Sequence, residues 1–123
     1  METEGLKATE AECAEGRTAP RVSLSDIEAN IAETHLFTAG AALASILACD
    51  GLDANYDRGL DILTVCMLVL RNGFTIIGKS APASPANFDA ELGRKLAYED
   101  AVRQVWPLMG YELRERLHRA DAA

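Results

Sequence analysis

The chain has 123 residues, of which nearly half are apolar (49%) and a quarter are charged (25%), as is typical of one soluble globular domain. Its formal net charge of −7 disfavours partners that are held through a phosphate backbone, so we expect no nucleic-acid partner. No run approaches the roughly 18–20 uncharged apolar residues of a membrane span, and the acidic start lacks the pattern of a secretory signal. We therefore expect a cytoplasmic protein without membrane partners.

The three cysteines, Cys13, Cys49 and Cys66, share no Cys-x-x-Cys or Cys/His spacing. An odd number of cysteines without ligand spacing indicates neither a disulfide framework nor a zinc site. We expect reduced thiols, with Cys66 buried, and no metal or other cofactor.

The composition divides the chain into three parts. Residues 1–20 are rich in Glu, Ala and Thr, show no apolar period and end at Pro20, which predicts a flexible acidic leader that adds little to the core. Residues 21–119 are expected to form a single domain, and residues 120–123 a short tail.

The first half of the domain predicts two or three short elements. Ser23 followed by Asp26 resembles a capping box, and apolar residues then recur at helical spacing, which predicts a helix from about Leu24 to Ala32. A brief strand is predicted over Thr34–Phe37. The small apolar run Ala39–Ala48 has no clear period, so it fits either a short buried helix or the start of a long loop.

The clearest local pattern is a β-hairpin. Ile62–Leu70 and Phe74–Gly78 are rich in β-branched residues and are joined by Arg71-Asn72-Gly73. The Asn-Gly pair predicts a two-residue type I′ turn, in which both residues have positive φ. The first strand is apolar on both faces, so each face needs a cover: a helix on one, and a second copy of the protein on the other.

The last third of the chain predicts two helices. Ser84 is placed to cap a helix that begins at Pro85 and runs to about Trp106. Pro107 ends or kinks that helix, because its ring removes a backbone donor and clashes with the preceding turn. A last helix is expected from about Leu108 to Arg119.

A seam of small residues runs along the first of these two helices and predicts a close contact with another backbone. We favour the hairpin over a second helix as the surface that it contacts. The fold class is therefore α+β: an antiparallel hairpin or three-stranded sheet packed on a long helix from the C-terminal half, with short flanking helices. The residues of the seam are Ala86, Ala90, Gly93, Ala97 and Ala101.

Several segments of the chain resemble one family of small tailed-phage and prophage proteins, the gp forty-nine and gene sixty-six family. The similarity covers Val22–Ala32 and Leu63–Leu117, and it implies a phage accessory protein without implying a mechanism. The segments that carry it are Cys66–Thr75, Gly78–Ala81, Pro85–Ala97 and Trp106–Tyr111.

Nothing in the residue pattern predicts an enzyme. His35 and His118 are the only histidines, and neither belongs to a Ser/His/Asp or Cys/His arrangement. The Gly78-Lys79-Ser80 sequence resembles the end of a phosphate-binding loop but lacks the upstream glycine-rich part. We therefore expect no catalytic residues.

One functional hypothesis is a small anionic ligand held where the second hairpin strand meets the helix start. A helix N-terminus offers free N–H groups, and amide and guanidinium groups nearby suit a phosphate or carboxylate. Such a protein would sequester a nucleotide signal of the host and so counter host defence. The candidate ligand-binding residues are Lys79, Ser80, Asn87, Arg94 and Tyr98.

The same residues also have a purely structural interpretation. Asn87 supports the helix start, Arg94 binds a carboxylate of the fold, and Glu91–Lys95 and Glu99–Arg103 form i,i+4 ion pairs, as Glu112–Arg116 and Glu115–Arg119 do further along.

The alternative functional hypothesis is a protein-interaction module. The acidic body would dock its last helix, through Leu113, Leu117 and Tyr111, onto a host protein and inhibit or redirect it. Either function is compatible with a homodimer or higher homo-oligomer, which we also expect.

Overall fold

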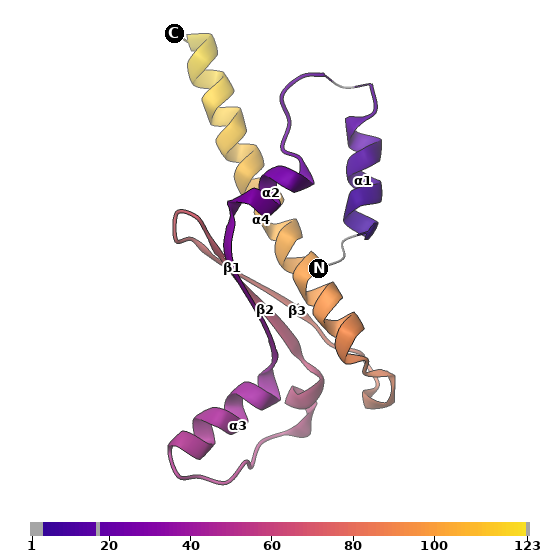
Figure 1. Ribbon diagram of the computed structural model, residues 1–123, viewed down its shortest axis with the longest axis vertical. Helices are drawn as coiled ribbons and strands as arrows, with labels where there is room; N and C mark the ends of the chain where they lie inside the picture. Colours follow the sequence, from indigo (N-terminus) through magenta and orange to yellow (C-terminus); the bar gives the residue numbers. More distant parts are fainter. Residues whose placement is uncertain (1–3, 17, 123) are drawn as a thin grey trace.

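A three-stranded antiparallel sheet forms one layer of the computed structural model, which describes residues 4–16 and 18–122. The long helix α4 crosses one face of the sheet, and α1 and α2 lie on the other side of α4 (Figure 1). The α+β class and the sheet-on-helix packing are as the sequence predicts. In chain order the elements are α1 (Glu4–Ala14), α2 (Leu24–Asn30), β1 (Ile31–Thr38), α3 (Ala39–Cys49), η1 (Arg58–Ile62), β2 (Thr64–Leu70), β3 (Thr75–Ser80), η2 (Pro85–Asn87) and α4 (Ala90–Ala122).

The two faces of the sheet differ in burial. Strand order is β1-β2-β3, and side chains alternate between the faces along each strand. Cys66 and Leu68 point to the α4 face and are fully buried, whereas Met67 and Ile77, which pair across β2 and β3, lie on the opposite face and are 38% and 61% exposed. A helix therefore covers one face of the hairpin as expected, and within one chain the other face stays open.

The closest approach between the sheet and α4 occurs at Gly78. A Cβ atom there would overlap the backbone oxygen of Ala97 and would lie 2.5 Å from the backbone nitrogen of Ala101. Gly93 packs in the same way against the Thr64 side chain. The small-residue seam thus contacts the sheet through its later members, as predicted.

The start of α4 differs from the prediction. Pro85 opens only the short 3-10 turn η2, and Ser84 makes no side-chain capping bond. The long helix begins at Ala90, where the Leu92 N–H donates to the Asp89 side chain at 3.1 Å. Asp89 is therefore the N-cap residue of this helix. Its side-chain oxygen accepts a hydrogen bond from a first-turn N–H group, as the serine hydroxyl was expected to do. The seam residues Ala86 and Ala90 consequently lie outside the buried contact.

The helix α4 also continues through Pro107, where the sequence predicted an end or a kink. Figure 1 shows one uninterrupted helix. The proline removes one hydrogen bond to the carbonyl of Arg103, and both residues are exposed, so water can bind that carbonyl. The predicted last helix is therefore the second half of α4.

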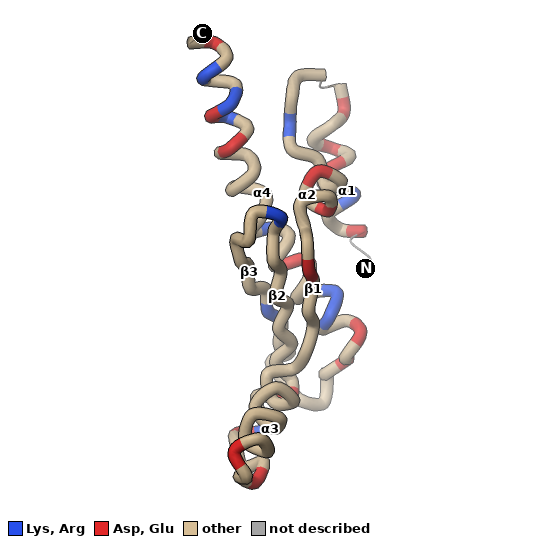
Figure 2. Tube along the Cα trace, turned by 60° about the vertical axis from the view of Figure 1, so that its left-hand side comes forward, with Lys and Arg blue, Asp and Glu red and all other residues tan. Residues whose placement is uncertain are grey.

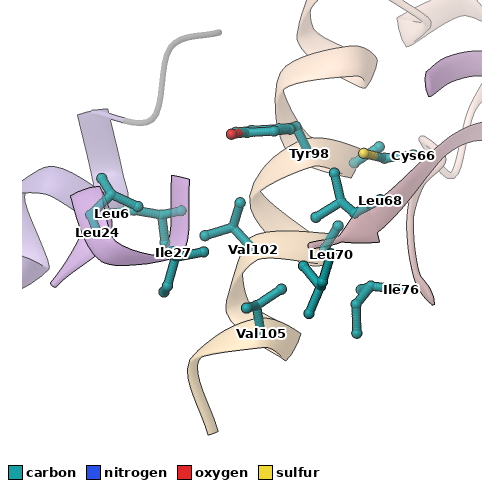
Figure 3. Packing of buried hydrophobic residues seen from close by; sticks show 12 residues of the cluster. Leu6, Leu24, Ile27, Cys66, Leu68, Leu70, Ile76, Tyr98, Val102 and Val105 are labelled. Atoms are coloured by element: carbon teal, nitrogen blue, oxygen red, sulfur yellow. The ribbon is translucent and has the colours of Figure 1, made fainter. Parts of the chain in front are cut away.

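The core lies on both sides of α4 (Figure 3). Leu24 and Ile27 of α2 pack on one side of the helix, and Leu68 of β2 lies on the other, with Val102 and Val105 between them. The predicted capping box fixes the start of α2: the Asp26 N–H donates to the Ser23 hydroxyl at 3.1 Å, and the Ser23 N–H donates to the Asp26 carboxylate at 2.9 Å.

The expected leader contains a helix. Residues Glu4–Ala14 form α1, and Leu6 is only 5% exposed because it joins the core beside α2. A single leucine gives no apolar period, so the sequence pattern could not reveal this docking.

The hairpin turn is longer than predicted. Only Gly73 has positive φ, at 89°, and Asn72 does not, so the connection is not type I′. The Gly73 N–H donates to the Leu70 carbonyl at 2.9 Å and the Phe74 N–H donates to the Asn72 side chain at 3.0 Å. A three-residue loop with a left-handed glycine gives this geometry.

The Ala39–Ala48 run is helical, which decides between the two readings of the sequence. The helix α3 projects from the end of the sheet (Figure 1). The helical alternative is thus confirmed, but the expected burial is not, because among its residues only Gly40 is buried. Gly40 packs on Asp61, whose carboxylate also accepts a hydrogen bond from the Tyr56 hydroxyl at 2.5 Å. The loop after α3 is thereby tied to the base of the helix.

The Gly78→Ala substitution is expected to lower the free energy of unfolding by about 1–3 kcal/mol, because the new methyl group meets helix backbone that cannot move aside. Chemical denaturation followed by circular dichroism measures this loss. Gly110→Ala in α4 is the control: a Cβ atom there meets nothing within 4 Å, so a gain of up to about 1 kcal/mol is expected. Equal stability of the two variants would contradict the close contact.

Candidate functional site

The corner between β3 and the start of α4 holds only a small cavity. Ser80 and Asn87 line it together with Phe88 and Leu92, and its volume is about 100 Å³. Ligand pockets for small molecules usually measure about 300–1,000 Å³. The aromatic and aliphatic side chains thus leave too little room here for a nucleotide.

The other predicted ligand residues lie elsewhere. Lys79 sits on the open face of the sheet, paired with Val65, and its backbone N–H donates to Asp100 at 2.9 Å. Tyr98 is 9% exposed within the core, where burial raises the pKa of its hydroxyl. Arg94 is exposed on α4. The structure therefore brings Ser80 and Asn87 together but not the five residues.

The predicted ion pairs along α4 are found only in its second half. Arg116 contacts Glu112 at 2.8 Å and Arg119 contacts Glu115 at 3.8 Å. Glu99, expected to pair with Arg103, is instead 4% exposed, and one of its carboxylate oxygens has no hydrogen-bond partner among the described residues.

A much larger hollow runs beside the second half of α4. It lies between that half-helix, α2 and the β2–β3 turn, and its volume is about 920 Å³. We call it the α4 groove. Figure 2 shows basic residues on the second half of α4, on the segment that precedes α2 and at the β2–β3 turn. Besides Ala29, the apolar lining consists of Val22, Leu70, Phe74, Leu108, Met109 and Leu113.

The rim of the α4 groove is locally basic on an acidic protein. Three arginines, Arg21, Arg71 and Arg116, line it against two carboxylates, Asp26 and Glu112. Both carboxylates have partners: the hydrogen bond from the Ser23 N–H lowers the pKa of Asp26, and Glu112 binds Arg116.

Arg71 is the rim arginine whose charge is least compensated. Its Nε donates to the Ala29 carbonyl at 2.5 Å, which holds the side chain beside the groove. No carboxylate of the described residues forms an ion pair with Arg71. An anionic group of a partner can therefore bind this guanidinium without displacing an existing ion pair.

The three predicted interface residues do not share one surface. Leu113 lines the α4 groove and also a second hollow of about 700 Å³ between α1 and α4. Leu117, one turn further along the helix, is 36% exposed. Tyr111 is 72% exposed and lies two residues from Leu113, which places it on another side of the helix.

Sequence reasoning missed most of the groove. Its lining comes from three segments that are far apart in the chain, around α2, the hairpin turn and the second half of α4. The sequence predicted Leu113 as an interface residue, whereas it treated Arg71 only as part of the hairpin connection. Long-range packing alone creates the cavity.

The described residues hold no recognisable catalytic or metal arrangement. His35 lies on the exposed strand β1, with its Nε2 3.0 Å from the Glu33 carboxylate. No group of three or more potential metal ligands occurs among residues 4–16 and 18–122. None of the helices in this part of the chain has the length and apolar character that crossing a membrane requires.

Cys66 is buried at the contact of the sheet with α4, as the sequence predicts, and burial raises the pKa of its thiol to about 11. Cys13 and Cys49 are exposed. A thiol with so high a pKa is almost entirely protonated near neutral pH, so Cys66 is a packing residue and a poor nucleophile.

Fold and surface together define a small α+β protein with a large groove beside its long helix, and the described residues show no formed catalytic centre. Comparison with protein families gives the narrower class. Residues 22–117 match the Phage protein (N4 Gp49/phage Sf6 gene 66) family, and the chain belongs to this family. Comparisons with curated proteins and with solved structures gave no match.

The burial of Cys66 predicts a two-step reaction with a thiol reagent such as DTNB at pH 8. The exposed thiols of Cys13 and Cys49 should react rapidly, and the Cys66 thiol only after denaturant is added. Because its pKa is raised in the folded state, the associated stability is present below the ordinary thiol pKa and is lost as the pH rises towards about 11. A Cys66→Ala variant should lose the reaction that appears only after denaturant is added.

The small corner cavity predicts no nucleotide binding at that position. Isothermal titration of the protein with a panel of cyclic and linear nucleotides should give no heat that depends on Ser80 or Asn87. Binding that is lost in Asn87→Ala would show that the corner opens for a ligand.

Proposed function

We propose that this phage protein is a non-enzymatic accessory protein that binds a host protein through the α4 groove. One observation carries the proposal: a groove of about 920 Å³ with an apolar lining and an arginine rim, built by three separate segments of the chain. Partly exposed apolar side chains such as Phe74 and Leu108, 53% and 43% exposed, mark surfaces that a partner covers.

The chemistry of the groove selects the kind of partner segment. Met109 and Leu113 along its length suit the apolar face of an amphipathic helix, which is a common way for proteins to bind a groove. Arg21 and Arg71 at the rim suit acidic residues on that segment. The remaining surface of a chain with net charge −7 repels other acidic proteins, so attraction is confined to the groove.

Sequestration of a small nucleotide signal has less support. The residues proposed for it lie on the open sheet face, in the core and at a cavity of about 100 Å³. The α4 groove is open and large, so it offers a nucleotide few enclosing contacts.

Affinity capture from the bacterial host tests the proposal. The wild-type protein should retain a host protein, and Leu113→Asp should weaken its retention about tenfold or more, because a carboxylate is then placed in the apolar lining. Arg71→Glu should weaken it as well, and more strongly at low salt, because a rim attraction becomes a repulsion.

Tyr111→Asp is the matched control, since it adds the same charge to another side of the same helix and should leave capture unchanged. Circular dichroism confirms that each variant is folded. Capture that survives both Leu113→Asp and Arg71→Glu would refute the groove as the binding surface.

A further inference from the structure

The two edge strands of the sheet, β1 and β3, differ in whether other parts of the chain bind their outward-facing backbone groups. At the β3 edge, side chains of α4 bind the outward-facing backbone groups: the Lys79 N–H donates to Asp100 at 2.9 Å, and Gln104 donates to the Ile77 carbonyl at 2.7 Å. These bonds occupy the groups that an added strand would need. The β3 edge is therefore closed to strand pairing.

At the β1 edge, by contrast, the outward-facing backbone groups of the strand centre are available to an added strand. The Ala39 N–H donates to the Leu63 carbonyl, which sets the alternation: Glu33, His35 and Phe37 direct their backbone groups to β2. The residues between them, Thr34 and Leu36, direct theirs outward. No hydrogen bond within the described chain uses these outward groups of Thr34 and Leu36.

The open edge is complementary to itself. If a second β1 strand pairs with it antiparallel about Thr34, each Thr34 faces the other, and each Glu33 faces His35 of the second copy. Glu33 and His35 are both exposed and lie on the same face of the strand, 3.0 Å apart at their nearest side-chain atoms. The pairing brings these acidic and basic side chains together across the new contact, and opposed threonines are a favourable cross-strand pair.

From this edge geometry we infer that the protein dimerises by antiparallel pairing of β1 with β1 of a second copy, centred on Thr34. The two sheets then form one six-stranded sheet with both α4 helices on the same face. Thr34 gives and receives backbone hydrogen bonds at the two-fold axis. The occupant that fits is a second copy: Glu33 and His35 contact each other at 3.0 Å within one chain, and the pairing places a further residue of opposite character against each of them.

Sedimentation equilibrium of the full chain tests the dimer, which is expected for the wild-type protein. Thr34→Pro removes the central N–H donor without touching the bonds to β2, so this variant should be monomeric. Thr75→Pro is the matched control. It removes an outward N–H at the closed β3 edge and should remain a dimer.

A charge exchange tests the register independently of proline. His35→Glu places like charges opposite each other and should raise the dimer dissociation constant about tenfold, which corresponds to roughly 1.4 kcal/mol. Adding Glu33→Lys to this variant restores opposite charges and should restore the dimer. Failure of the double variant to recover the affinity would overturn the proposed register.

Two further results would overturn the inference. The first is a monomeric wild-type protein at its highest soluble concentration. The second is a dimer that survives Thr34→Pro but is lost in Met67→Asp, which would place the contact on the open sheet face instead of the β1 edge. Circular dichroism spectra of all variants show whether each is folded.

Discussion

The contact of α4 with the hairpin at Gly78 determines the position of most other elements. Because this residue has no side chain, the backbones of Ala97 and Ala101 approach β3 so closely that a Cβ atom at position 78 would overlap them. This contact fixes the distance between α4 and the sheet and the direction in which α4 crosses it. The helix has 33 residues, whereas β3 has only 6, so α4 extends well beyond the sheet. It also brings Asp100 and Gln104 to the edge of β3, where they bind its backbone.

A consequence of this length is that α4 has two different roles. Its first half is packed between the sheet and α2, and it contributes Val102 and Val105 to the core. Its second half extends past the sheet (Figure 1), so its apolar side chains face only α2, α1 and the hairpin turn. The groove that we propose as a binding surface is the space left by this mismatch between helix and sheet.

The remaining exposed apolar residues also follow from the small size of the sheet. A sheet of this width buries one face under a single helix and leaves Met67 and Ile77 exposed on the other. Pairing through β1 would widen the sheet and would leave the α4 groove, which lies beside the hairpin turn, to a different partner. Self-association and partner binding then use separate surfaces of the same protein.

Features that depend on neighbouring residues could be predicted from the sequence. The capping box at Ser23, the hairpin, the burial of Cys66, the small-residue seam and the ion pairs of the last turns are all properties of short segments, and a family resemblance added the phage context. Two local details were predicted wrongly. Asn72 lacks positive φ, because the connection is a three-residue loop in which only Gly73 is left-handed, and Pro107 lies inside a helix, because the carbonyl that it leaves without a donor is open to water.

The candidate site likewise combines features that the sequence predicts with features that only the fold creates. The sequence identified Leu113 and Leu117 as an apolar stripe, because helical spacing places them together. It could not find the groove, whose lining joins three segments that are far apart in the chain. It also could not find the closed and open edges of the sheet, since these depend on where α4 comes to lie. Local spacing thus determined which elements form and which faces are apolar. Only the packing of α4 on Gly78 decided which of those faces are covered and which remain available to a partner.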